Sequence, residues 1–323
     1  MIRRYAAHHG RLRSLETPEQ DSTEALWFDV FSPTPEEERM LEQSVRVNIP
    51  SREEMEEIEI SSRLYYEDGA AFMTAILPAR SDADVPEMAP VTFVLADGLL
   101  ITVRFHEPQA FRTFPLRAEK TSMGCDSAES VLIALLEVII DRLADILERV
   151  GRDVDRISRS IFRHPANSRG KSRDFQHVLE EIGLKGDLSS NVRDSLASLE
   201  RMFAFLAQYT LERKSPRDVR ARLKTLTRDA ASLSDHAGFL SQKITFLLDA
   251  TLGMINIEQN ATIKIFSVAA VVFLPPTLIA SIYGMNFTHM PEVKWVFGYP
   301  FAIGLMIASA VLPYLYFKRR DWL

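Results

Sequence analysis

The side chains near the C-terminus that could do chemistry are uncharged hydroxyls and amides. They fall on one series of positions that steps by three or four residues, which is the spacing of one helix face. With the small and apolar residues between them, they form the stripe Asn260, Ile263, Ser267, Ala270, Leu274, Thr277 and Ser281. Single hydroxyls commonly bond the preceding helical turn, but that explanation suits one residue better than a whole stripe. The stripe therefore predicts a helix face that meets water or polar partners.

Two uncharged segments must position this stripe. Residues 265–283 carry no charge and would form a helix about 28 Å long, enough to cross the apolar core of a bilayer. Residues 296–317 form a second such segment after a short loop. Basic residues flank the pair at Lys264 and at 318–320, which predicts cytoplasmic flanks and an external loop. Two buried helices of a soluble protein are the alternative, and they do not account for uncharged runs of this length placed so close together.

A pair of helices cannot enclose a channel. A water-lined stripe therefore requires several copies of the chain, with the first segment around an axis and the second against lipid. At the outer mouth, a ring of Asn286 side chains would present carboxamide oxygens, which suit a divalent ion that keeps its water shell, as Mg²⁺ does. Gly284 would permit an unusual backbone conformation or a close approach at the axis, and Met285 could pack the turn.

The rest of the chain reads as an α+β arrangement. The segment "VTFVLADGLLITVRF" predicts two strands joined by an Asp97-Gly98 turn, and Thr34 before Pro35 marks a helix start. From Ser127 to Ile161, apolar residues step by three or four and predict one long helix. The predicted segments are an α/β domain (1–125), long cytoplasmic helices (126–215), a stalk helix (216–264), a first transmembrane helix (265–283), an external loop (284–295), a second transmembrane helix (296–317) and a basic cytoplasmic tail (318–323).

Composition excludes several classes of function. A formal net charge of -6 and the lack of a basic stripe argue against a nucleic-acid partner. The single cysteine, Cys125, excludes an intrachain disulfide framework. The chain has no glycine-rich phosphate loop and no nucleophile and base at recognisable spacing, so neither an enzyme nor a bound organic cofactor is predicted.

The segments "YGMNF" and "MPEVKWVFGYP" resemble the signature and following loop of the CorA family of magnesium and cobalt transporters. The similarity extends to "INIEQNATIKIFSVAAVVFLPPTLIASIYGMNF" and "PYLYFKRRDWL", whereas the first 250 residues resemble the family mainly in the order of their elements. The resemblance implies a homopentameric funnel in a bacterial inner membrane, with both termini cytoplasmic and the first span lining the pore. It also implies influx of magnesium, and of cobalt or nickel, driven by the membrane potential.

The resemblance assigns roles to single residues. Asn286 matches the outer selectivity ring, Thr277, Leu274 and Asn260 match pore-facing positions, and Asp249 matches an acidic position at the inner end of the pore. Magnesium bound between cytoplasmic subunits would hold the channel shut. Its carboxylate ligands are not fixed by the match, and the candidates are Asp229, Asp235, Asp82, Asp84 and the cluster Glu53 to Glu59.

Glu292 in the loop could form an outer acidic ring that captures cations. Two alternatives remain open at this point. The first is a zinc transporter of the same superfamily, which His289 near the mouth would suit. A membrane-anchored oligomeric sensor or scaffold that conducts nothing would use the polar stripe only for helix packing.

Overall fold

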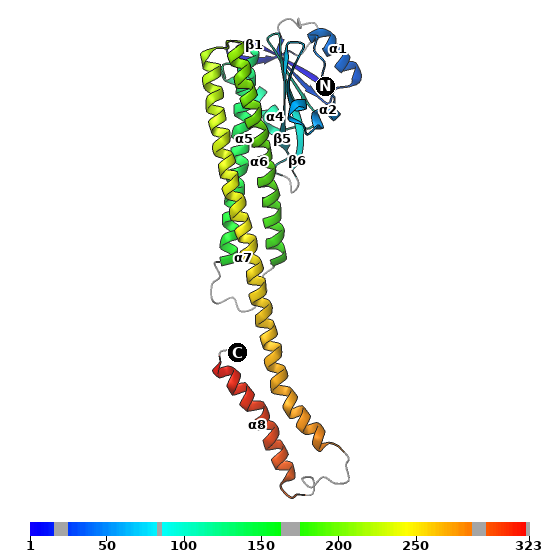
Figure 1. Cartoon of the computed structure of the whole chain (residues 1–323), viewed down its shortest axis with the longest axis vertical. Coiled ribbons are helices and arrows are strands. Elements are labelled where there is room, and N and C mark those ends of the chain that lie inside the picture. The colour runs from blue at the N-terminus through cyan, green and yellow to red at the C-terminus, as the bar shows by residue number, and fades with distance from the viewer. Residues whose placement is uncertain (16–24, 83–85, 163–174, 286–294, 321–323) are drawn as a thin grey trace. The chain divides into compact units, whose positions relative to one another are not determined.

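The computed structural model describes residues 1–15, 25–82, 86–162, 175–285 and 295–320. The chain divides into two compact units, Met1–Leu248 and Asp249–Leu323, and each is described by itself. The first unit holds a seven-stranded sheet and most of the helices (Figure 1). The second holds the end of the longest helix and the last helix.

The sheet has the strand order β2-β1-β3-β7-β6-β5-β4. Its strands are β1 (Ile2–His8), β2 (Arg11–Ser14), β3 (Ala25–Phe31), β4 (Leu64–Glu67), β5 (Ala70–Ala79), β6 (Glu87–Ala96) and β7 (Leu99–Arg104). Strands β3 and β7 are parallel neighbours, and the other pairs are antiparallel. The predicted turn joins β6 to β7 with positive φ at both Asp97 (47°) and Gly98 (81°), as a tight hairpin turn requires.

Alternating residues of the strands fill two cores. Phe28 and Phe72 face one side, where they pack with Leu41 of α1 (Pro35–Val45) and Met55 of α2 (Arg52–Glu56). On the other side the indole of Trp27 contacts the ring of Phe114, which belongs to α4 (Gln109–Lys120). Helices α5 (Ala128–Phe162) and α6 (Phe175–Glu212) also pack against the strands on the α4 side. Each face of the sheet is thus covered by helices, and the predicted α/β domain is confirmed (Figure 1).

The remaining helices are α3 (Ile60–Arg63), α5 (Ala128–Phe162), α6 (Phe175–Glu212), α7 (Arg217–Tyr283) and α8 (Gly298–Arg319). Thr34 caps α1 as expected. Its hydroxyl oxygen accepts a hydrogen bond from the backbone N–H of Glu37, and the carboxylate of Glu37 accepts one from the backbone N–H of Thr34. The predicted apolar face of α5 is buried along its length, from Leu132 to Ile161. The 67 residues of α7 form one continuous helix, which includes both the segment predicted as a stalk and the segment predicted as the first transmembrane helix.

Ion pairs fix the first part of α7 to α5. Arg222 donates two hydrogen bonds to the carboxylate of Glu137, at 2.8 and 2.7 Å. Further along, Lys243 pairs with Asp155. The part of α7 that belongs to the first unit is therefore tied to the bundle by two charged contacts as well as by apolar packing.

Candidate functional site

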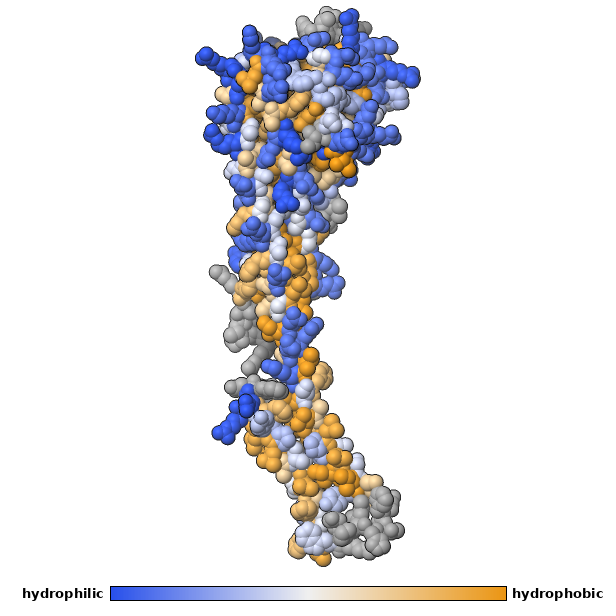
Figure 2. Space-filling view, in the orientation of Figure 1, coloured by the Kyte–Doolittle hydropathy of each residue, from blue (hydrophilic) through white to orange (hydrophobic). Residues whose placement is uncertain are grey.

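The two uncharged segments are helical and exposed. α7 and α8 are each long and apolar enough to cross a membrane, and only 6% of the apolar window of each is buried. A core helix of a soluble protein would be mostly covered, so this exposure argues against the two-core-helix alternative. Figure 2 shows the hydrophobic surface of the second unit. α8 ends with Lys318 and Arg319 in its last turn, where positive charge complements the helix dipole.

The polar stripe lies on the uncovered face of α7. All of its members lie in one uninterrupted helix and are exposed: Asn260, Ile263, Ser267, Ala270, Leu274, Thr277 and Ser281. The buried or half-buried residues nearby are Val268, Ala269, Val272, Pro275, Pro276, Ile279 and Tyr283. At about 100° per residue the two sets centre on opposite sides of the helix, roughly 180° apart. Within the second unit, the face used for packing is thus separate from the stripe.

Thr277 shows what a stripe hydroxyl can do. Its Oγ1 donates a hydrogen bond to the carbonyl oxygen of Phe273 at 2.7 Å, which is the local bond that single hydroxyls commonly form. Donation uses the hydroxyl proton and leaves the oxygen lone pairs able to accept. An exposed oxygen of this kind can receive a hydrogen bond from the water shell of a cation.

Two prolines lie within the membrane-length part of α7. The helix continues through Pro275 and Pro276, although neither can donate a backbone hydrogen bond. The carbonyls of Val271 and Val272, four residues earlier, therefore lose their usual helical donors. In an apolar environment such carbonyls need other donors, which water or a neighbouring chain can provide.

The end of α7 places the first two signature residues. The N–H of Gly284 donates to the carbonyl of Ala280 at 2.9 Å, and a Cβ at position 284 would lie only 3.2 Å from the same oxygen. The φ of Gly284 is outside the left-handed region, so no unusual backbone conformation requires glycine there. Met285 is 48% exposed. Asn286, His289 and Glu292 lie outside the described residues.

The candidate sensor carboxylates are spread over the first unit. Asp82 follows β5 and forms ion pairs with Arg142, at 3.3 Å, and with Arg149, both on α5. The hydrogen bond from Arg149 is the main reason that its pKa is lowered. Asp229 and Asp235 are exposed on α7, as are Glu53, Glu54, Glu56, Glu57 and Glu59 near α2. Asp84 lies outside the described residues.

Among the described residues of a single chain, no group of three or more His, Cys, Asp or Glu side chains could hold a metal ion. Asp249 is exposed on α7, at the start of the second unit.

Sequence reasoning missed an acidic surface formed by α5 and α7. Burial raises the pKa of Asp141, Arg117 opposes that effect, and the negative charges of Asp145, Glu137 and Asp229 raise it further. Glu137, Asp141 and Asp145 recur every four residues on α5, a spacing visible in the sequence. Their nearness to Asp229 on α7 depends on tertiary packing and left no local signal.

Comparisons with known proteins agree with this architecture. Residues 22–319 match the family model described as CorA-like Mg²⁺ transporter protein. The chain is 38% identical over 325 residues to the magnesium transport protein CorA of Haemophilus influenzae, with all of both chains covered. The protein of that name from Escherichia coli K12 is also 38% identical, again over 100% of both chains. The complete structure of the CorA magnesium transporter from Methanocaldococcus jannaschii superposes with a TM-score of 0.79 at 20% identity, covering 100% of this chain and 99% of that one.

Proposed function

The chain belongs to the family of CorA-like Mg²⁺ transporter proteins, and we propose that it is a magnesium channel whose pore is lined by the polar stripe of α7. It is an integral membrane protein of a bacterial inner membrane, with both termini in the cytoplasm and five copies around the pore. Relatives named for magnesium over the full length of the chain support this ion over zinc. Cobalt and nickel are further ions that the same path would carry.

The single observation that carries the proposal is the stripe on the uncovered face of α7. Hydroxyl and amide groups exposed on a membrane-length helix are costly in lipid unless they face water or polar partners. A ring of α7 helices around an axis would turn the stripe inward and leave α8 next to lipid. Assembly would then satisfy the polar groups and create the ion path in one step.

The chemistry of the stripe suits a hydrated divalent ion. Neutral oxygens at Asn286, Thr277 and Asn260 can accept hydrogen bonds from the water shell of Mg²⁺, which that ion gives up reluctantly. Ala270, Ser267 and Ser281 complete a path that lacks charged side chains, and Leu274 narrows it with an apolar constriction. Gly284 and Met285 complete the outer filter, with Glu292 as an external ring.

The membrane potential is a sufficient driving force. A double charge that crosses an inside-negative membrane gains about 4.6 kcal/mol per 100 mV. Asp249 would draw the ion into the inner end of the path by its negative charge. Influx then needs no nucleotide, in keeping with a sequence that has no phosphate-binding loop.

Regulation by internal magnesium would close the channel through carboxylates on neighbouring subunits. Asp82 is the less suited candidate, since it is already paired with two arginines that a metal ion would have to displace. Asp229 and Asp235 on α7 are better suited, because Asp229 lies near acidic groups of α5 whose repulsion a divalent ion would relieve. Binding that favours the closed state shifts the population towards it.

The test is magnesium uptake into proteoliposomes that contain a fluorescent indicator, under an imposed inside-negative potential. Asn286→Ala and Thr277→Val should each reduce uptake, whereas Ser309→Ala should match the wild type, because Ser309 lies on α8 and donates to Met306 within its own helix. Uptake of zinc without magnesium would favour a zinc transporter. No flux of either ion through the wild type would favour a non-conducting sensor or scaffold and overturn the proposal.

A further inference from the structure

The first unit contains a cavity unconnected with the polar stripe. Its volume is about 380 Å³, within the usual range for small-molecule sites. It lies where β3 and β7 end, bounded by Phe31, Phe105 and His106 and by the start of α4. These are the only parallel neighbours in the described sheet, and ligands of α/β proteins bind outside the carboxyl ends of such strands.

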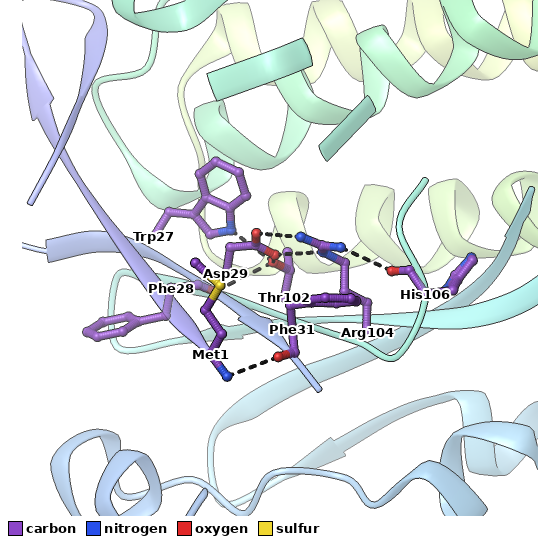
Figure 3. A network of polar contacts seen from close by, with 8 residues as sticks. All are labelled: Met1, Trp27, Phe28, Asp29, Phe31, Thr102, Arg104 and His106. Atoms are coloured by element: carbon purple, nitrogen blue, oxygen red, sulfur yellow. Dashed lines mark hydrogen bonds and ion pairs between the residues drawn. The ribbon is translucent and has the colours of Figure 1, made fainter. Parts of the chain in front are cut away.

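The walls of the cavity are held rigidly by the buried ion pair of Arg104 and Asp29. Arg104 donates to the two carboxylate oxygens of Asp29, at 2.9 Å each, and its third hydrogen bond reaches the carbonyl of His106 at 3.0 Å. The guanidinium also lies over the ring of Phe31, with 4.6 Å to the centroid. Figure 3 shows this network, in which Phe31 and His106 contact one arginine. A preformed wall lowers the entropic cost of binding.

His106 is one of the residues that bound the cavity. The residue is 3% exposed, and Nε2 of its ring lies 2.9 Å from the carbonyl oxygen of Leu77. A carbonyl only accepts, so Nε2 carries the proton and Nδ1 is left with a lone pair. Nδ1 has no hydrogen-bond partner within the described part of the protein. Nδ1 is itself buried, so His106 forms part of the wall without offering this atom to a ligand.

Among the described residues that line the cavity, one cation and one anion have no ion-pair partner. Arg80 pairs with Glu87 at 3.9 Å, and the two arginines of α5 pair with Asp82. Arg112 and Glu107 are exposed, and neither has an ion pair among the described residues. The start of α4 adds partial positive charge, since no side chain caps it and its first turn has no acidic residue.

We propose that this cavity binds a small zwitterion of the amino-acid type with an apolar or aromatic side chain. Its carboxylate meets Arg112 and the start of α4, and its ammonium group meets Glu107. The side chain lies against Phe31 and Phe105, which form the apolar part of the wall. This inference concerns the first unit alone and stands whether or not the chain conducts magnesium.

The test is calorimetric titration of the full chain in detergent with L-phenylalanine, phenethylamine and 3-phenylpropionate, after subtraction of protein-free micelles. L-Phenylalanine should bind saturably, and the two analogues, each lacking one charge, should bind roughly tenfold more weakly or worse. Arg112→Gln and Glu107→Gln should each weaken the binding of L-phenylalanine by a similar factor. Lys120→Gln and Glu119→Gln on the same helix are the matched controls and should leave the affinity for L-phenylalanine unchanged.

Two results would overturn the proposal. Binding of 3-phenylpropionate as tight as that of L-phenylalanine, with no effect of Glu107→Gln, would make the cavity a simple anion site. The lack of saturable binding by L-phenylalanine, in protein whose unfolding midpoint matches that of the controls, would remove the site altogether.

Discussion

Replacement of Asp29 with asparagine should destabilise the first unit by about 3 to 5 kcal/mol, the usual cost of leaving one member of a buried ion pair unpaired. Both side chains of the Asp29–Arg104 pair are 0% exposed. Asparagine has nearly the shape of aspartate, but its amide NH₂ would face a guanidinium N–H that now has no acceptor. The free energy of unfolding should therefore fall enough to lower the folding equilibrium constant roughly 10²- to 10⁴-fold.

The assay is urea unfolding followed by the fluorescence of Trp27, whose indole N–H donates to Thr102 at 3.0 Å and so reports on the same network. Trp295 and Trp322 are replaced by phenylalanine, so that only this indole contributes to the signal. The double variant Asp29→Leu with Arg104→Met removes both charges and should lose much less stability than Asp29→Asn. The reasoning is refuted if Asp29→Asn costs under about 1 kcal/mol, or if the double variant costs more than the single one.

Three further predictions concern other groups of the first unit. Burial lowers the pKa of His106, so the unfolded chain binds a proton that the folded chain does not. The free energy of unfolding should then fall as the pH drops below about 6.5, and a His106→Gln variant with unchanged pH dependence in urea unfolding would contradict this. Burial also raises the pKa of Cys125 to about 11, so iodoacetamide should alkylate the native protein roughly 100-fold more slowly than the unfolded one, and equal rates would show an accessible thiol. Glu137→Gln removes the bidentate pair with Arg222, worth about 1 kcal/mol at this partly exposed position, and should speed hydrogen exchange in the first turns of α7. Glu148→Gln removes an exposed ion pair within α5 and should leave hydrogen exchange in α7 unchanged. An equal effect of the two substitutions would show that the pair of Glu137 with Arg222 does not hold α7 against α5.

Local patterns in the sequence were enough to predict the long helices. The apolar steps of α5 and the uninterrupted stretch of α7 carry their own periodicity, and the Asp97-Gly98 turn requires positive φ that its residues supply. The hairpin of β1 and β2 was not predicted. In β1, Arg3 and Arg4 are adjacent, so alternation is weak, and the strand exists because it pairs with β3.

Contacts between distant segments could not be predicted from one sequence. The parallel pairing of β3 with β7 joins residues more than 70 positions apart, and the Asp29–Arg104 pair depends on it. The same holds for the ties between α5 and α7, such as Arg222 with Glu137. The stripe on α7 was predicted from spacing, because a stripe needs only helical geometry, whereas the pore roles of its residues and of Asp249 came from the family resemblance. Which face of the helix is covered depends on packing.

The two parts of α7 differ in what satisfies their side chains. In the first unit, Arg222 and Lys243 are paired within the chain, and apolar residues such as Leu226 and Leu240 are buried against the bundle. In the second unit, the stripe that contains Thr277 remains exposed within a single chain, although the helix around it is apolar. Polar groups in a membrane need water or partners, so the stripe cannot be at its lowest free energy in an isolated copy. If the chain conducts as proposed, the residues that line the ion path are also the ones that assembly would cover, and a change that removes their polarity should weaken both properties together.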